Sequence, residues 1–547
     1  MCGIFAFLAE SKINNGIWKN INLKRYANKI KHRGPDNTIS EQINDNLYFH
    51  FHRLMINGLN DESNQPFYMN GIWLICNGEI YNYKTLIDTN GFEYKTNSDC
   101  EVIIHMYLKY GIEYTCKHLD GVFAFVLYDE NKDILIAARD HLGIRPLYVG
   151  IVNEDNYNTL AFASEAKALT FMYKVRQFPP RHYWTSEDNS YYNYYNLNEK
   201  FDYKQNDISN DTEETICCRI RYLLTEAVRK RFITTDVEVG CLLSGGLDSS
   251  LISSICSRMF DIPKRLKTFS IGLKGSPDLE NAQAVADMIG TTHYSYEVSE
   301  KDFLDAIEET IYALGSYDIT TVRASVGHML VSKYVRRDTN VKVLFSGEVA
   351  DEMGSYLYML NAPSNDEYHT ECTRLLSDIH FFDGLRSDRS ISYAGLEARV
   401  PFSDKEFMEY YMSVSPKLKM FNNKDRIEKY LIRKAFSKHM YLPDSVLWRR
   451  KNGFSDSVSS KTRSWSIIIQ EYVDKLISDK EFETESVKYT HNPPLTKEAY
   501  YYRKVFHEKY DEGGYSYNNL TPYMWLPKWC GDIKDPSARV LNIYKAD

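Results

Sequence analysis

The sequence is short of the features that define several classes of protein. No apolar run reaches the roughly 18 residues that a membrane-spanning helix needs, and no segment is of low complexity or repeats another. The ten cysteines form no Cys-x-x-Cys pair and have no histidine partner at the spacing of zinc ligands. Neither a disulfide framework nor a zinc site is therefore predicted, which suits a reducing compartment.

Positive charge is also scarce. Lysine and arginine number 66 against 74 aspartates and glutamates, a net charge of −8, and there is no basic stripe with interleaved aromatic residues. A nucleic acid is therefore not an expected partner. The first residues lack the basic flank, the long apolar stretch and the cleavage site of a secretory signal. We expect a cytoplasmic protein that does not associate with membranes.

The pattern of strand-like and helical segments divides the chain into two parts. At 547 residues the chain is too long for one ordinary core, and 43% of it is hydrophobic. Residues 1–195 are dense in short strand-like runs, as in packed sheets with flanking helices. Residues 196–212 are polar and aperiodic, and we predict a linker there. In residues 213–547 strands alternate with helices, which predicts a parallel α/β sheet followed by a mostly helical C-terminal part.

The chain opens Met-Cys-Gly, which places a thiol at position two. One interpretation is structural, because free cysteine is among the most buried residue types. The other is catalytic. If Met1 is removed, Cys2 carries both a thiol and a free α-amino group, whose pKa of about 7.7–8.0 suits it to take the thiol proton near neutral pH. These three residues alone leave both interpretations open.

The segment SGGLDSS, Ser244–Ser250, follows the apolar run Val237–Leu243 and begins a helical pattern. A strand, a glycine turn and a helix N-terminus together present backbone N–H groups to a phosphate. The Walker A pattern is absent, so a different loop is predicted, with Asp248 as a ligand for Mg²⁺. The alternative is an ordinary glycine turn at the end of a strand.

A second acidic segment has the same placement. SGEVADE, Ser346–Glu352, follows the apolar run Val341–Phe345. In a parallel sheet this puts Glu348 and Asp351 at the carboxyl end of another strand, where ligands of α/β sheets bind. Alone, an acidic turn would explain these residues equally well.

Taken together, these segments are similar to the glutamine-dependent asparagine synthetases, and the resemblance runs through nearly the whole chain. In the first half the similar segments are MCGI, RGPD (33–36), HRL (52–54), NGEIYN (77–82), SDCE (98–101), LDGVFAFVLYD (119–129), ARDHLGIRPLY (138–148) and FASEAKAL (162–169). In the second half they are SGGLDSS, a loop like that of ATP pyrophosphatases, SIGLKGSPDL (270–279), TTVRAS (320–325), SGEVADE, GLEARVPFSD (395–404), WRRKNGFSD (448–456) and DPSAR (535–539).

The resemblance implies a fold and a reaction. The fold is an N-terminal nucleophile-type αββα glutaminase domain, residues 1–195, followed by an ATP-pyrophosphatase α/β domain, residues 213–547. The reaction is the ATP-dependent synthesis of asparagine from aspartate, with ammonia from glutamine, through β-aspartyl-AMP, giving AMP and pyrophosphate. It implies ATP with Mg²⁺, no organic prosthetic group and an internal tunnel with apolar walls for ammonia. A homodimer is compatible with the sequence.

The resemblance also implies roles for glutaminase residues. Cys2 would attack the glutamine amide, and Asn77 with the N–H of Gly78 would form the oxyanion hole. Arg53 would bind the α-carboxylate of glutamine, because a guanidinium suits bidentate binding. The α-ammonium would be held by two acidic residues, Glu79 and Asp99.

Synthetase roles are implied in the same way. Glu348 would act as the base or as an orienting carboxylate for attack by ammonia, and Lys451 would offset phosphate or transition-state charge. Asp248 and Asp351 would coordinate Mg²⁺. The predicted ATP contacts are Leu243, Ser244, Gly245, Gly246, Asp248, Ser249, Ser250, Ile271, Ser346 and Gly347. The predicted contacts for aspartate or pyrophosphate are Thr320, Thr321, Arg323 and Arg399.

The chain departs from the family pattern at three positions. Val349 replaces the usual glycine of SGEGADE, and because a β-branched residue poorly tolerates φ > 0, we expect the loop after Glu348 to be reshaped. Asn452 replaces a glutamate, and Cys100 a threonine. Two alternatives stay open: an amidotransferase that amidates another carboxylate, and a catalytically silent sensor or storage protein.

Overall fold

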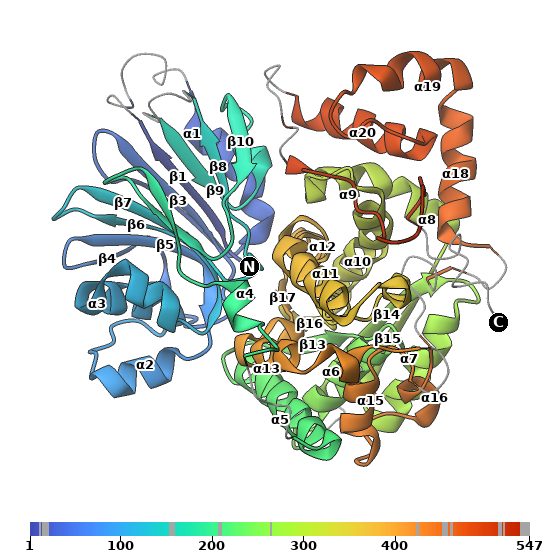
Figure 1. The fold of residues 1–547 in the computed structure, drawn as a ribbon. Coiled ribbons are helices and arrows are strands. Elements are labelled where there is room, and N and C mark those ends of the chain that lie inside the picture. Colours follow the sequence, from blue (N-terminus) through green and yellow to red (C-terminus); the bar gives the residue numbers. More distant parts are fainter. Residues whose placement is uncertain are drawn as a thin grey trace.

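The structure is a computed structural model that describes residues 1–9, 13, 21–152, 159–205, 211–262, 265–422, 426–450, 458–459, 463–511, 517 and 520–536 (Figure 1). Its two parts lie side by side: a sandwich of two antiparallel sheets, blue to cyan in Figure 1, and a larger domain built on a parallel sheet. No helix in the described part of the chain combines the length and the apolar character needed to cross a membrane.

The two sheets of the first domain have six strands each, in the orders β10-β8-β9-β1-β3-β2 and β12-β11-β7-β6-β5-β4. The strands are β1 Gly3–Leu8, β2 Asn37–Gln42, β3 Leu47–Arg53, β4 Phe67–Met69, β5 Ile72–Ile80, β6 Gly121–Asp129, β7 Ile134–Arg139, β8 Tyr148–Ile151, β9 Leu160–Ala163, β10 Lys174–Gln177, β11 His182–Thr185 and β12 Ser190–Asn193. The helices are α1 Leu23–Ala27, α2 Tyr83–Asn90 and α3 Val102–His118.

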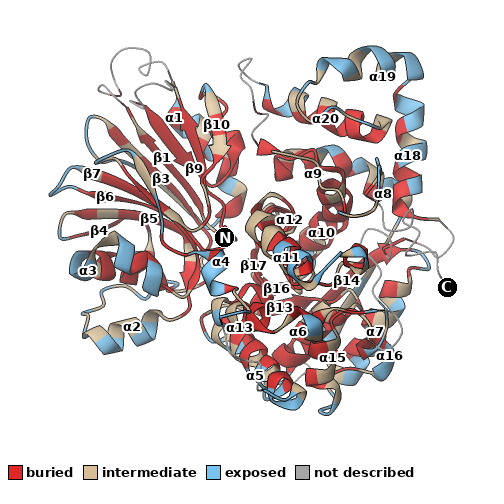
Figure 2. Ribbon diagram, in the orientation of Figure 1, coloured by how far each residue is buried: buried red, intermediate tan, exposed pale blue. Residues whose placement is uncertain are grey.

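The sequence of β1 is apolar throughout because both faces of the strand are buried. Ile4 and Ala6 point into the core between the two sheets, where they join Val126 of β6. Phe5 and Phe7 point to the outer face and pack in the cluster that holds α1. Since β1 pairs with β3 on one side and β9 on the other, the strand is enclosed in every direction. Buried residues run through both sheets (Figure 2).

The second domain holds a five-stranded parallel sheet in the order β15-β14-β13-β16-β17. Its strands are β13 Val239–Leu242, β14 Lys267–Leu273, β15 Thr292–Val298, β16 Val343–Phe345 and β17 Glu397–Arg399. The helices from the end of the first domain onward are α4 Leu197–Lys200, α5 Glu213–Phe232, α6 Leu247–Ser257, α7 Pro277–Ile289, α8 Glu300–Asp305, α9 Ile307–Leu314, α10 Ile319–Asp338, α11 Asn365–Asp378, α12 Asp383–Ser392, α13 Lys405–Ser413, α14 Pro416–Lys419, α15 Tyr430–Ser437, α16 Asp444–Leu447, α18 Trp465–Leu476, α19 Asp479–Glu485 and α20 Lys497–Tyr510.

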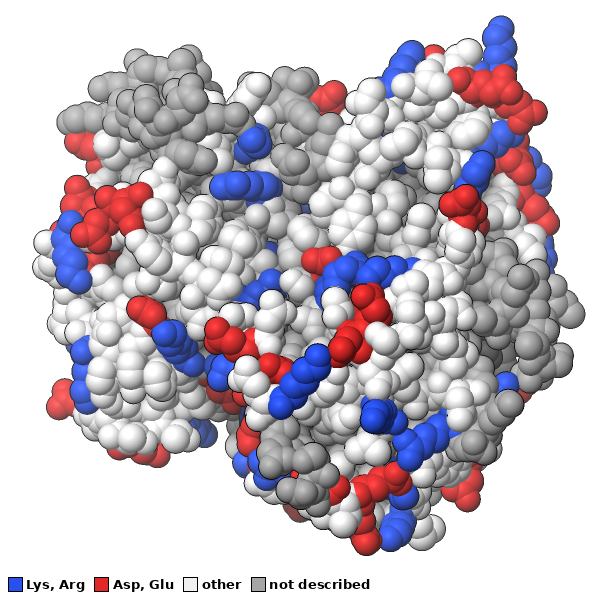
Figure 3. All heavy atoms as spheres, viewed as in Figure 1, with Lys and Arg blue, Asp and Glu red and all other residues white. Residues whose placement is uncertain are grey.

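The predicted fold class is confirmed: two sheets with flanking helices precede a parallel sheet with a helical C-terminal part. Helix α3 runs from Val102 to His118, with Gly111 at φ +79° inside it. Within the predicted linker, 196–212, the structure forms the short helix α4. On the face drawn in Figure 3, basic and acidic side chains are interspersed.

The N-terminus lies at the junction of the two domains (Figure 1). Met1 is only 1% exposed, and its ammonium nitrogen lies 3.8 Å from Oε2 of Glu397 on β17. Helix α12, whose residues from Gly384 to Ser392 are all buried, lies in the same region. The start of β1 is therefore covered by elements of the second domain.

Candidate active sites

Cys2 lies directly before β1. Its Sγ donates to the carbonyl oxygen of Leu54 at 3.8 Å and accepts from the Leu54 N–H at 3.5 Å, while Arg33 donates to the Cys2 carbonyl at 3.0 Å. While Met1 is attached, burial raises the pKa of the thiol to about 11 and lowers the pKa of the Met1 α-ammonium to about 6. Burial thus keeps the thiol of the unprocessed chain protonated, and the thiolate is the nucleophilic form.

Asn77 on β5 is fully buried, yet neither its amide nitrogen nor its amide oxygen has a hydrogen-bond partner among the described residues. An unsatisfied buried polar group costs about 1–3 kcal/mol, so a ligand that pairs with this amide would be favoured. Gly78 follows it, and a Cβ there would lie 2.9 Å from the Cβ of Phe123 on the neighbouring strand. Only glycine fits at this position.

The two acidic residues are joined by Asn57. Its Nδ2 donates to Oε2 of Glu79 at 2.7 Å and to Oδ1 of Asp99 at 3.3 Å. The other oxygen of Asp99 accepts from the N–H of Ile80 at 2.6 Å. One asparagine thus fixes the two carboxylates that were predicted to hold an ammonium group.

Arg53, at the end of β3, is held by the loop that follows it. The guanidinium donates to the carbonyl of Asn60 at 2.8 Å, to Oδ1 of Asn64 at 2.7 Å and to the carbonyl of Gly58. Burial lowers its pKa, and the charge of Cys2 raises it again. The guanidinium of Arg53, which lies near the thiol, is suited to bind a carboxylate.

Burial also raises the pKa values of Glu79 and Asp99. It raises the pKa of Asp99 to about 6, even though the hydrogen bonds from Ile80 and Asn57 act in the opposite direction. Burial raises the pKa of Glu79 well above its usual value, and the neighbouring carboxylates of Glu397 and Asp99 add to that effect. Carboxylates in this environment gain strongly from a cationic ligand.

A cavity of about 240 Å³ lies where the carboxyl ends of β13, β14 and β16 meet. The predicted residues that line it are Leu243, Ser244, Gly246, Asp248, Ser249, Ile271, Thr320, Ser346, Gly347, Glu348 and Asp351. Thr320 Oγ1 is buried there without a hydrogen-bond partner in the described structure. The parallel order of the strands thus brings the two predicted loops to one site.

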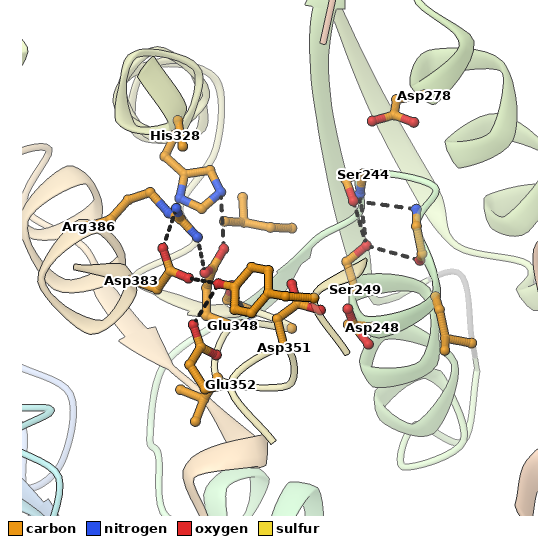
Figure 4. A pocket seen from close by; sticks show the side chains of 18 of the residues that line it. Ser244, Asp248, Ser249, Asp278, His328, Glu348, Asp351, Glu352, Asp383 and Arg386 are labelled. Carbon is orange, nitrogen blue, oxygen red and sulfur yellow. Dashed lines mark hydrogen bonds and ion pairs between the residues drawn. The ribbon is translucent and has the colours of Figure 1, made fainter. Parts of the chain in front are cut away.

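The phosphate loop is shaped by its serines. The N–H of Ser244 donates to Oγ of Ser249 at 3.1 Å, and the two hydroxyl oxygens are 2.9 Å apart (Figure 4). Gly245 makes the turn at φ +74°. Gly347 brings the second loop against the first, because a Cβ there would lie 2.5 Å from the backbone nitrogen of Ser249.

Asp248 and Asp351 converge on one cation, the ammonium of Lys429. Lys429 Nζ lies 2.6 Å from Oδ1 of Asp351 and also contacts Oδ2 of Asp248. The remaining oxygen of Asp248, Oδ1, is buried and has no hydrogen-bond partner among the residues described. Two converging carboxylates, one with an unused oxygen, fit Mg²⁺, which binds through one or two carboxylates together with phosphate oxygens.

Glu348 belongs to a buried cluster at the other side of the cavity (Figure 4). Arg386 of α12 contacts Oε2 of Glu348 and lies 2.5 Å from Oδ1 of Asp383. The Tyr356 hydroxyl donates to Asp383 at 2.7 Å. Burial raises the pKa of Glu348, although Arg386 lowers it, and burial together with Arg386 lowers the pKa of His328 to about 3.

Three of the residues predicted to contact aspartate or pyrophosphate have other partners in the structure. Thr321 is buried and donates through N and Oγ1 to Asp318, both at 2.8 Å, which caps α10. Arg323 is held in bidentate pairs with Glu498 and Asp535. Neither lines the cavity, because each side chain is already committed to a structural partner.

Arg399 is the third of these residues. It is fully buried in β17 and lies 2.8 Å from Oε1 of Glu397 and 3.0 Å from Oε2 of Glu79. It also donates to the backbone of Arg231 and Thr234. Arg399 therefore joins the parallel sheet to the first domain instead of facing the nucleotide cavity.

Five further residues singled out in the sequence have different outcomes. Lys451 and Asn452 lie outside the described residues. Ser250 is fully buried on α6 and does not line the cavity. Val349 has a left-handed backbone with φ +78°, the conformation that suits a glycine. The loop is therefore not reshaped as expected, and the backbone of Val349 is strained instead. Cys100 is buried, with its Sγ 3.7 Å from the carbonyl oxygen of Gly78.

Sequence reasoning missed several residues that the sites use. Asn57 lies in no motif that was singled out, and nothing local shows that it reaches two carboxylates. Asp383 and Arg386 look like a solvated i, i+3 pair on a helix. Lys429 precedes α15 with no pattern around it. Leu54, which contacts the Cys2 thiol, is the one exception, because it is the last residue of the family-like segment HRL.

Comparisons with known proteins find a family match for each of the two domains. Residues 1–185 match the family described as "Glutamine amidotransferase domain", and residues 219–367 and 359–530 match "Asparagine synthase". The chain is 41% identical to the chicken (Gallus gallus) protein named asparagine synthetase [glutamine-hydrolyzing], over 100% of this chain and 99% of that protein. It is 41% identical to the protein of that name from Cricetulus griseus and 40% to that from Homo sapiens, each over 95% of this chain and 96% of the relative.

Proposed function

The chain belongs to the glutamine-hydrolysing asparagine synthetases, and we propose that the two sites described above carry out the two halves of that reaction. The enzyme makes asparagine from aspartate with ammonia released from glutamine, through β-aspartyl-AMP, and gives AMP and pyrophosphate. The observation that carries the assignment of the first site is the unpaired, buried amide of Asn77 between the Cys2 region and the pair of Glu79 and Asp99.

In the glutaminase site, Cys2 attacks the amide carbon of glutamine. After Met1 has been removed, the α-amine of Cys2 takes the thiol proton and passes it to the leaving ammonia. The amide of Asn77 and the N–H of Gly78 bind the oxyanion, a donor set in which each member is worth about 10²–10³ in kcat. Water then hydrolyses the thioester to glutamate.

Substrate binding uses the charges around the thiol. Arg53 binds the α-carboxylate of glutamine, and Glu79 and Asp99 bind its α-ammonium. Support comes from burial: both carboxylates have raised pKa values, so a bound ammonium restores the stability of their charged forms. Asn57 orients the two carboxylates toward one point.

In the synthetase site, the β-carboxylate of aspartate attacks the α-phosphorus of ATP, and pyrophosphate leaves. Ser244, Gly246 and Ser249 hold the phosphates with backbone N–H and hydroxyl groups, and Ile271 lines the adenosine side. Thr320, whose buried hydroxyl lacks a partner among the described residues, hydrogen-bonds to pyrophosphate or aspartate.

Ammonia then attacks the carbonyl carbon of β-aspartyl-AMP and AMP leaves. A proton must be accepted as the C–N bond forms, and Glu348 accepts it. Its burial favours this role, because a raised pKa makes the carboxylate a stronger base. Arg386 fixes the Glu348 carboxylate, so Arg386 is a positioning residue.

Asp248 and Asp351 would hold Mg²⁺, which supplies charge neutralisation of the phosphates when it is bound. Lys429 contributes a fixed positive charge between the same carboxylates. Lys451, a homodimer and a cytoplasmic location remain predictions.

The assignment is tested by measuring pyrophosphate, asparagine and glutamate separately. Pyrophosphate release should require aspartate; if another carboxylic acid supports it and aspartate does not, the enzyme amidates that acid instead. Cys2→Ala should abolish glutamine hydrolysis and glutamine-supported synthesis, while synthesis from an ammonium salt continues. Loss of both activities would contradict the two-site assignment.

A further inference from the structure

A small cavity lies between the two domains. It has a volume of about 10 Å³, which is room for one molecule the size of water or ammonia. The residues that line it are Ile144 and Arg145 of the first domain and Val349, Gly384, Ser387, Asp388, Ala398 and Val400 of the second. We call it the junction cavity.

On one side the junction cavity borders the glutaminase site through a chain of ion pairs. Arg145 NH2 lies 3.3 Å from Oε2 of Glu397, and the ammonium of Met1 lies 3.8 Å from the same oxygen. Glu397 pairs with Arg399, which pairs in turn with Glu79 of the glutamine site. Glu397 thus links Arg145 of the cavity wall to the chain end that precedes β1.

On the other side the junction cavity borders the synthetase site. Val349 follows Glu348 in the chain and is 2% exposed. Among the described residues, Val349 alone lines both the junction cavity and the nucleotide cavity. Its side chain therefore separates the two spaces.

The backbone of Val349 shows that this placement is costly. A φ of +78° suits glycine, and a β-branched residue holds it only where its surroundings fix it. The strain puts a branched side chain at the boundary between the two cavities. We propose that Val349 is the constriction through which ammonia passes from the junction cavity to Glu348, so that its size sets how much ammonia reaches β-aspartyl-AMP.

The chemistry of the cavity suits ammonia better than ammonium. Ile144, Ala398, Val400 and Val349 give it apolar walls. Its two charged lining residues, Arg145 and Asp388, are already paired with Glu397 and Arg33, so a cation entering the cavity would lose its hydration without gaining an unpaired counter-ion from the lining. The Oγ of Ser387 is buried in the same wall and has no hydrogen-bond partner among the described residues. A neutral molecule that donates and accepts hydrogen bonds matches this lining.

The inference rests on the proposed function, and its test compares two routes of nitrogen. Ammonia from glutamine has to pass Val349, whereas ammonia from solution enters through the nucleotide cavity. The variants are Val349→Leu, which enlarges the constriction residue, and Val349→Gly, which removes the side chain and the strain. Val487→Leu is the control with the same change of side chain, because Val487 is exposed and lines neither cavity.

The measured quantity is asparagine formed per glutamate released, beside the rate of synthesis from an ammonium salt. Val349→Leu should lower the ratio at least threefold, with less than a twofold change in the ammonium-supported rate. With unlabelled glutamine and added ¹⁵N-ammonium, the labelled fraction of asparagine should rise in this variant. Val349→Gly should keep or raise the ratio, and Val487→Leu should leave it unchanged.

Two results would overturn the proposal. The first is an unchanged ratio in Val349→Leu, and the second is an equal fall of the glutamine- and ammonium-supported rates, which would make Val349 a structural part of the synthetase loop. If Val349→Leu does not fold, a ratio that falls in Val349→Gly also overturns it. Absence of synthesis from both nitrogen sources in the unaltered enzyme would instead contradict the proposed function.

Discussion

The guanidinium of Arg33 binds both carboxylate oxygens of Asp388, at 2.8 and 3.0 Å, across the junction of the two domains. Arg33 also holds the carbonyl of Cys2, and Asp388 lies on α12, which carries Arg386 beside Glu348. One helix therefore contacts groups of both active sites. Arg33, Asp388 and Arg386 are fully or almost fully buried, so the ion pair of Arg33 and Asp388 is shielded from solvent.

Removing this carboxylate should destabilise the protein. Asp388→Ala leaves the buried Arg33 without its bidentate partner, and loss of one member of a buried pair costs about 3–5 kcal/mol. We expect an earlier unfolding transition in urea. The matched control is Asp366→Ala, which removes an exposed partner of Lys204 and should cost less than about 1 kcal/mol. Equal shifts for both variants would show that the buried pair contributes little.

Processing of the N-terminus should decide glutamine hydrolysis. A chain with a removable segment in front of Cys2 keeps the thiol at a raised pKa and lacks the free amine, so it should hydrolyse glutamine at least 100-fold more slowly. Cleavage that exposes Cys2 should restore the rate. Synthesis from an ammonium salt serves as the internal control and should be equal before and after cleavage. Full hydrolysis by the extended chain would remove the amine from the mechanism.

The pKa of Asp99, about 6, predicts a pH dependence. The group is charged above this value and loses its charge as the pH falls through it, so binding of the glutamine ammonium weakens toward low pH. We expect kcat/KM for glutamine hydrolysis to fall up to about tenfold per pH unit below pH 6, because this parameter reports the free enzyme. Asp99→Asn should have a low kcat/KM and a changed profile, in which the remaining decline comes from Glu79, whose pKa is also raised by burial. A flat profile from pH 7 to 5 in the unaltered enzyme would contradict the assignment.

Glu348→Gln should separate the two activities. The amide cannot accept a proton, so synthesis from glutamine or ammonium should fall about 10²–10⁴-fold. Glutamine hydrolysis should change less than twofold, since Glu348 lies in the other domain. Glu113→Gln, at an exposed pair with Lys117, is the control and should change neither rate. Normal synthesis by Glu348→Gln would exclude this carboxylate as the base.

The Asp248 and Asp351 pair predicts a metal requirement. Chelation of divalent cations should stop pyrophosphate release and leave glutamine hydrolysis intact. Asp351→Asn should raise the Mg²⁺ concentration for half-maximal pyrophosphate release about tenfold, because one of two converging carboxylates is lost. The exposed variant Asp366→Asn should leave this concentration unchanged. The same Mg²⁺ dependence in Asp351→Asn and the unaltered enzyme would argue for binding by the phosphates alone.

Much of the fold could be predicted from local patterns. The run of β1 is apolar at every position, and that of β6 at every position before Tyr128, which indicates strands buried on both faces. SGGLDSS and SGEVADE each follow an apolar run, and parallel pairing of β13 with β16 brings them together as expected. These predictions succeed because the information is contained within one segment or two neighbouring strands.

The remaining site residues depend on docking between distant segments. Arg323 and Arg399 were assigned to ligands, yet a guanidinium suits a buried carboxylate as well as a phosphate, and only the tertiary structure decides between them. Asp383 and Arg386 have an ordinary helical spacing, and it is the packing of α12 against α10 and β17 that places them in the wall of the nucleotide cavity. No local pattern carries that information.

The burial of Met1 has a consequence for the order of events during synthesis. An aminopeptidase needs an accessible chain end, and in the finished molecule Met1 lies against Glu397 of the second domain. At translation rates of about 5–20 residues per second, Glu397 emerges only tens of seconds after Met1. We therefore expect the methionine to be cleaved within that interval. A chain that folds before cleavage would trap its own initiator residue, and such molecules would make asparagine from ammonium alone.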